Sequence, residues 1–277
     1  MEDLVWEERP VLLRPAAVIA FEGWGDAGAA ASGAVDVLLD QLAGFRFATL
    51  DCERFFDFQV ARPLIELDET GTRSIDWPDT EFHALSAADR DLVIVTGIEP
   101  HAMWKSYCAR VIEVLKEMNV EEVVTLGAFI GEVAHSLPVP LIGVSNDSEL
   151  LEQHRLMASG YEGPTGIVGV LNDALAAEGF KTVSVWAAVP HYLSSQEYPP
   201  GALALLEKTI EIVGIGLDRS DLTTAAEEFR REVDEAIDDP EMRSYVSELE
   251  TQALAEETGL DPGDRLVDEI ERFLRDT

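Results

Sequence analysis

The chain of 277 residues is 47% hydrophobic and 27% charged, a balance typical of a folded globular protein and unlike that of a disordered one. Its formal net charge of −34 repels phosphate backbones and anionic lipids, which excludes nucleic acid and membranes as partners. The acidic start of the sequence differs from a signal peptide, and the two cysteines form no CxxC pair, which together favour a cytoplasmic protein.

Short runs rich in β-branched residues alternate with longer amphipathic stretches over the first two-thirds of the chain. The pattern predicts strands at residues 16–21, 45–51, 92–97, 122–127, 141–144 and 181–189. It predicts helices at about residues 27–42, 102–118 and 167–177. Two further runs, 63–67 and 72–77, flank an Asp-Glu-Thr-Gly turn and predict a β-hairpin.

Apolar strands separated by helices favour an α/β protein whose mainly parallel sheet is covered on both faces. We therefore expect a three-layer α/β/α fold, in which the predicted hairpin makes the sheet mixed.

The composition changes near residue 218. Residues 218–277 contain 20 acidic and seven basic residues, and their apolar residues recur at three- and four-residue spacing, which predicts three amphipathic helices. Asp-Pro pairs at 239–240 and 261–262 separate these helices. The sequence thus divides into an α/β core, residues 1–217, and an acidic helical extension, residues 218–277. The extension either packs on the core as solvated helices or serves as a docking arm for a partner.

A glycine-rich segment lies between the first strand and the first helix. Three glycines there satisfy the pattern G-x-G-x-x-G: Gly23, Gly25 and Gly28. With Asp51 near the end of the next strand, this pattern is typical of dinucleotide binding. However, Trp24 would crowd the turn that approaches a pyrophosphate, and Asp26 would fill the helix N-terminus with a carboxylate. A structural turn in which Asp26 caps the helix is the favoured interpretation.

A second segment, Gly163-Pro164-Thr165-Gly166, precedes the helix predicted at residue 167. Its backbone N–H groups could bind an anion, but no Arg or Lys is adjacent to it. The favoured interpretation is a rigid turn with Thr165 as the N-cap of the helix.

Three residues are candidates for acid–base chemistry: Asp26, Glu132 and His191. His191 follows a long strand, where α/β sheets place ligands, and a histidine there acts either as a general base or as a loop anchor. Glu132 and His135 are three residues apart, but two ligands do not make a metal site. The sequence contains no H-E-x-x-H, G-x-S-x-G or Walker lysine, so we predict no metal, no cofactor and no complete catalytic set.

Four motifs occur in a characteristic order. Gly-Trp-Gly-Asp-Ala-Gly at 23–28 is followed by Thr-Leu-Gly-Ala at 125–128, by the stretch 161–171, and by Trp-Ala-Ala-Val-Pro-His-Tyr-Leu at 186–193. Over residues 10–217 this order resembles the proteasome-assembly-chaperone family, of the second-chaperone type, and specifically its bacterial members with an acidic helical C-terminal extension. The resemblance implies an α/β/α fold of the phosphorylase/hydrolase class and assembly into homo-oligomers such as trimers.

Two functions from different classes follow. The first is a non-enzymatic, chaperone-like scaffold that binds proteins, including itself, and that the resemblance links to proteasome subunits. The second is a hydrolase or phosphorylase-like enzyme acting on a small polar metabolite. Its cleft would be built from residues 23–26, residues 163–166 and His191, which all follow predicted strands and can converge at one end of the sheet.

Overall fold

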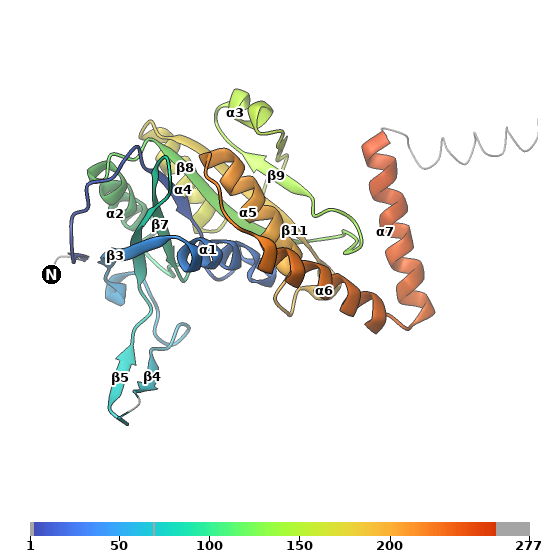
Figure 1. Ribbon diagram of the computed structural model, residues 1–277, viewed down its shortest axis with the longest axis horizontal. Helices are drawn as coiled ribbons and strands as arrows, with labels where there is room; N and C mark the ends of the chain where they lie inside the picture. The colour runs from blue at the N-terminus through green and yellow to red at the C-terminus, as the bar shows by residue number, and fades with distance from the viewer. Residues whose placement is uncertain (1–2, 69, 259–277) are drawn as a thin grey trace, which may run out of the picture.

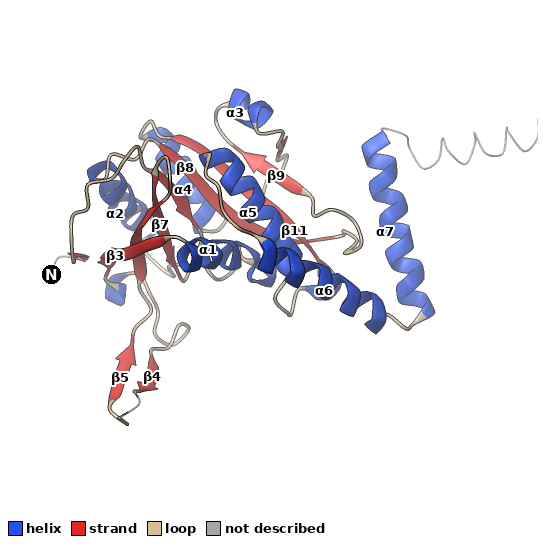
Figure 2. Cartoon of the chain, viewed as in Figure 1, coloured by secondary structure: helices blue, strands red, loops and turns tan. Residues whose placement is uncertain are grey.

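The structure is a computed structural model that describes residues 3–68 and 70–258. A mixed sheet of nine strands forms its centre, in the order β1-β3-β6-β7-β2-β8-β11-β9-β10, with helices on both faces (Figures 1 and 2). The strands of this sheet are β1 (Leu4–Trp6), β2 (Ala16–Ile19), β3 (Ala43–Leu50), β6 (Thr80–Ser86), β7 (Asp91–Gly97), β8 (Glu122–Gly131), β9 (Leu141–Val144), β10 (Met157–Ala158) and β11 (Lys181–Pro190).

The four central strands β7, β2, β8 and β11 are adjacent and parallel. Successive residues of β2 pack on opposite faces, with Val18 in one apolar cluster and Ala17 and Ile19 in the other. Strands buried on both faces must be apolar throughout, which explains why these runs were recognisable in the sequence.

Helices α1 (Ala30–Gln41), α5 (Pro199–Val213) and α6 (Ser220–Ala236) contribute to the first cluster, while α2 (Trp104–Glu117) and α4 (Ile167–Ala177) contribute to the second. The α/β/α expectation is therefore confirmed. The described residues also contain the short helices η1 (Ala27–Ala29), η2 (Cys52–Arg54), α3 (Ser148–Gln153) and η3 (His191–Leu193).

The source of the mixed character differs from the prediction. The predicted hairpin forms, as β4 (Leu64–Leu67) and β5 (Arg73–Asp76), but it is a separate two-stranded sheet that projects from the body (Figure 1). The main sheet is mixed because β6 runs antiparallel to both β3 and β7, and β9 runs antiparallel to β11. Strand β6 was not predicted, although its alternation of buried and half-buried residues is the pattern of a strand with one covered face.

Two of the three predicted C-terminal helices lie in the described residues, as α6 and α7 (Pro240–Thr258), and the third lies outside them. Helix α6 packs on α5: Val233 joins the first cluster, and Phe229 meets Tyr198 with ring centroids 5.6 Å apart. Helix α7 stands beyond it (Figure 1) and packs Val246 and Leu249 against Ala134. The boundary at residue 217 stays a prediction.

Among the described residues, no helix combines the length and the apolar character that a membrane crossing requires.

Candidate functional site

The carboxyl ends of the parallel strands meet at one edge of the sheet, where the loop after β2 is fixed to its neighbours. Glu22 N–H donates to Gly97 O at 2.9 Å, and Glu99 N–H donates to Glu22 O at 2.8 Å. On the other side, Ala128 N–H donates to Gly25 O at 2.7 Å. The glycine-rich segment therefore lies between the ends of β7 and β8, where α/β sheets commonly bind ligands.

Asp26 occupies the N-terminus of α1 with its own side chain. Its Oδ1 accepts hydrogen bonds from the backbone N–H groups of Ala31 and Ser32, at 2.7 and 3.3 Å, and its Oδ2 accepts from Ser32 Oγ at 2.6 Å. Burial raises the pKa of Asp26, while these hydrogen bonds oppose the rise. The carboxylate reaches past the N-cap position, which is Ala29. It thus fills the anion position of this helix, as the sequence predicted.

Glu99 fills the corresponding position of α4 and was missed in the sequence. Its Oε1 accepts from Ile167 N–H at 2.7 Å, and its Oε2 accepts from Trp24 N–H at 3.4 Å. The predicted N-cap role of Thr165 is wrong: Gly166 is at the N-cap position, and Thr165 Oγ1 donates to its carbonyl oxygen at 3.4 Å. The one local signal for Glu99 is that a carboxylate follows two residues after a buried strand. The N–H groups that it binds are distant in sequence, so no local pattern predicts the contact.

Two glycines of the G-x-G-x-x-G pattern, Gly23 and Gly28, are explained by packing and backbone geometry inside the chain. A Cβ on Gly28 would lie 2.8 Å from Tyr198 Cβ, whereas a Cβ on Gly25 would make only an ordinary contact, 3.4 Å from the Trp186 ring. Gly28 and Gly23 also have φ of +61° and +126°, which side chains disfavour. At Gly23, a Cβ would lie 3.2 Å from Glu99 Cβ. These two glycines make room for the protein's own side chains.

The strand order also contradicts the dinucleotide alternative. That motif needs the acidic residue at the end of the strand beside the glycine-rich turn. Asp51 follows β3, and both β6 and β7 lie between β3 and β2. The two halves of the fingerprint are therefore not adjacent.

The other candidate residues lie in a second region. His191 begins η3 and packs its ring edge-on against Tyr192 and Tyr245, with centroids 5.3 and 5.5 Å apart. Glu132 is exposed just beyond β8. Within the described chain, no hydrogen bond, ion pair or ring contact joins His191 or Glu132 to Asp26. The structure thus brings together residues 23–26 and 163–166 around Glu99, with His191 placed against α7.

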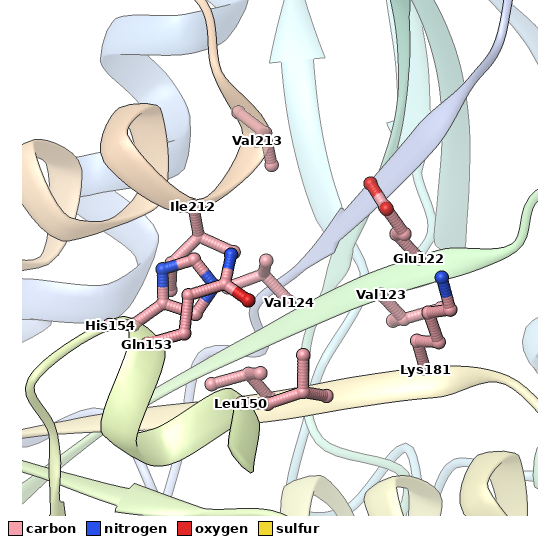
Figure 3. Close-up of a pocket in the computed structure, with 10 residues that line it drawn as sticks. Glu122, Val123, Val124, Leu150, Gln153, His154, Lys181, Ile212 and Val213 are labelled. Atoms are coloured by element: carbon pink, nitrogen blue, oxygen red, sulfur yellow. The ribbon is translucent and has the colours of Figure 1, made fainter.

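A cavity of about 270 Å³ lies at the opposite end of the strands, near the amino ends of β8 and β11 (Figure 3). Glu122 and Lys181 lie on one side of it, and Gln153 and His154 on the other. Arg90 binds the Glu122 carboxylate at 2.9 Å. The remaining lining residues are aliphatic: Val123, Val124, Leu150, Val183, Ile212 and Val213. This cavity is separate from the predicted cleft.

The edge of the sheet that carries the glycine-rich segment has an exposed aromatic side chain and several carboxylates. Trp24 is 64% exposed although it lies in a tightly fixed loop. Burial, followed by repulsion from Asp26 and Asp36, raises the pKa of Glu22. No group of three or more His, Cys, Asp or Glu side chains in the described part of the chain is placed to hold a metal ion.

The nine-stranded mixed sheet, covered by helices on both faces, defines a three-layer α/β/α protein. The model of the PAC2 family matches residues 20–237, and the chain belongs to this family. The family expected from the sequence is thereby confirmed.

Two solved structures are similar in both sequence and fold. A PAC2 family protein from Streptomyces avermitilis is 43% identical with a TM-score of 0.80, covering 84% of this chain and 99% of its own. A proteasome-assembly chaperone homologue from Mycobacterium tuberculosis is 37% identical with a TM-score of 0.78, covering 83% and 99%. A Corynebacterium glutamicum protein shares the fold, with 22% identity, a TM-score of 0.83 and coverage of 91% and 97%. The search of curated proteins found no match.

Proposed function

We propose that this chain is a non-enzymatic, chaperone-like scaffold that binds other proteins, with a role linked to proteasome assembly, and that it associates with itself. The link to proteasome assembly comes from the 37% identical relative, which is described as a proteasome-assembly chaperone homologue. The family and fold are compatible with this role, but a fold by itself does not determine function.

One observation carries the proposal. At the edge where an α/β enzyme binds its substrate, the N-termini of α1 and α4 are filled by Asp26 and Glu99. A phosphate or carboxylate substrate would have to displace a hydrogen-bonded carboxylate of the same charge. The same edge exposes Trp24, a residue type enriched in protein interfaces. The edge therefore suits a protein surface better than an anionic metabolite.

The test is affinity capture by the tagged full-length protein from its native lysate, followed by identification of the captured chains. Wild type and a control variant, Val11→Glu, are expected to capture proteasome subunits or another defined complex. Val11 suits the control because it is 99% exposed and outside this edge. Trp24→Glu is expected to lose the capture, since a charge replaces a central aromatic contact. Capture of no foreign protein by any of the three would contradict the assembly role.

A further inference from the structure

The β4–β5 hairpin, together with Trp77, forms an arm that projects from the body of the molecule (Figure 1). Both strands are exposed along their whole length, and they pair only with each other within the described chain. An isolated two-stranded hairpin is at best marginally stable in water. Covering the apolar side chains of this arm against another surface would therefore stabilise it.

The two faces of the arm differ in chemistry. Directly opposed residues share a face, and the register pairs Ile65 with Ile75 and Leu67 with Arg73. Ile65, Leu67 and Ile75 are 59%, 67% and 56% exposed, and Trp77, two residues after Ile75, continues this face at 47%. The opposite face carries Leu64, Glu66, Ser74 and Asp76. The first face is thus apolar, and its strand residues include one cation and no acid.

The difference in charge between the two faces determines which face of the arm a second copy of this acidic chain can approach. The whole chain has a net charge of −34, so two copies repel each other over most of their surfaces. The apolar face of the arm avoids this repulsion, because its only charged strand residue is Arg73. Arg73 forms no ion pair with any described residue.

A complementary surface, which we call the edge patch, consists of Trp24, Tyr161 and Glu22. Trp24 is 64% exposed and Tyr161 66%. The two aromatic residues border the same loop: the Trp24 ring lies next to Gly166, and the Tyr161 hydroxyl donates to Pro164 O at 2.9 Å. The patch is therefore an exposed aromatic surface on a fixed backbone.

The edge patch also carries a negative charge, on Glu22, that is complementary to the positive charge of Arg73. Glu22 and Asp36 have no cationic partner among the described residues. Burial, followed by repulsion from Asp26 and Asp36, raises the pKa of Glu22, and burial, followed by repulsion from Asp40, Asp26 and Glu197, raises that of Asp36. A cation placed beside Glu22 would reduce that repulsion.

We propose that the apolar face of the arm binds the edge patch of a second copy of this chain, with Arg73 beside Glu22 of that copy. The contact is heterologous because the two surfaces differ, so repeated contacts close into a ring when the rotation between copies permits. The inference rests on the proposed scaffold function, since it names a protein occupant for the same edge.

The test is the mass of the purified full-length protein in solution, measured by light scattering over a dilution series. Wild type is expected to exceed the mass of a monomer. The double variant Ile65→Ser, Ile75→Ser is expected to weaken association about tenfold or more. The control, Leu64→Ser, lies on the opposite face of the same strand at 62% exposure and is expected to associate like wild type. Diluted until all of them are monomeric, these chains should melt at the same temperature, because the arm lies outside the core.

Charge exchange tests the pairing itself. Arg73→Glu and Glu22→Arg are each expected to weaken association, and the two combined are expected to restore it. A monomeric wild type, an assembly that survives the double serine variant, or a charge exchange that restores nothing would each overturn the proposal. If wild type is monomeric but still captures foreign proteins, the contact between copies is refuted and the proposed assembly role is not.

Discussion

His135, in the loop after β8, donates a hydrogen bond from Nε2 to Asp234 Oδ1 on α6, at 3.1 Å and 99 residues along the chain. An ionised carboxylate only accepts, so Nε2 carries the proton and Nδ1 accepts from the Tyr192 hydroxyl at 2.8 Å. The Tyr192 oxygen in turn accepts from the backbone N–H of His135 at 3.0 Å. This buried imidazole joins the loop, η3 and α6.

Replacing Asp234 tests that connection. Asp234→Ala leaves the buried Nε2–H of His135 without its acceptor, so we expect a loss of about 1–3 kcal/mol in the free energy of unfolding. Hydrogen exchange in α6 and α7 should become faster. Glu235→Ala is the matched control, because Glu235 is equally exposed and its ion pair within the described residues is with Arg231 on its own helix. Equal effects of the two variants would show that the histidine does not hold α6.

The capping role of Asp26 predicts a graded response to substitution. Asp26→Ala removes the acceptor of three hydrogen bonds at the start of α1, and we expect a loss of about 1–2 kcal/mol in urea unfolding. Asp26→Asn keeps one oxygen for Ala31 N–H and avoids burying a charge, so its cost should be smaller. An asparagine variant as unstable as the alanine variant would contradict this account.

Gly127 is expected to tolerate no side chain. A Cβ at this position of β8 would lie 2.5 Å from Trp186 Cε3, and the same ring packs against Gly25. Gly127→Ala should therefore destabilise the protein by about 1–3 kcal/mol, as overpacked cores do. The matched control is Gly160→Ala, because a Cβ on Gly160 would meet open space and Gly160 has no positive φ. Gly179 also has open space, but its φ of +89° would strain an alanine. Gly160→Ala should leave the melting temperature unchanged.

Asp79 predicts a loss of stability as the pH rises. Burial first, and then repulsion from Glu81, raises the pKa of Asp79 from 3.8 to about 6. The folded state therefore holds this proton more tightly than the unfolded chain, and stability falls between these two pH values. Asp79→Asn should be more stable than wild type at pH 7 by about 1 kcal/mol after solvent screening, and equal to it below pH 3.8. Denaturant titrations across this range provide the measurement.

Ionisation of Glu81 is expected to change stability with pH in the opposite direction. Hydrogen bonds from His83 and Arg46 lower its pKa from 4.5 to about 2, against the effect of burial. It stabilises the folded state above pH 4.5, and this contribution is lost as the pH falls toward 2. Glu81→Gln should flatten the acid side of the stability profile. An unchanged profile below pH 4.5 would mean that these bonds do not persist in solution.

Much of the secondary structure was predictable because its signals are local. The helix expected at 167–177 begins and ends at Ile167 and Ala177, and the strand expected at 181–189 is one residue longer. Strand β6 escaped because a run covered on one face alternates with polar residues and looks less apolar. The capping carboxylate at Asp26 was also predictable, since it lies only five residues from the Ala31 N–H that it accepts.

The α/β/α class, the family and the capped glycine turn could be predicted from the residues alone, because hydrophobic periodicity and helix capping act between residues close in the chain. That β6 and β7 separate Asp51 from the glycine turn, and that Glu99 fills the N-terminus of α4, became visible in the folded chain. The tertiary structure also placed the hairpin outside the main sheet and joined His135 to α6. Strand order and contacts between distant side chains depend on how whole faces of the sheet and helices pack, so local sequence patterns do not predict them.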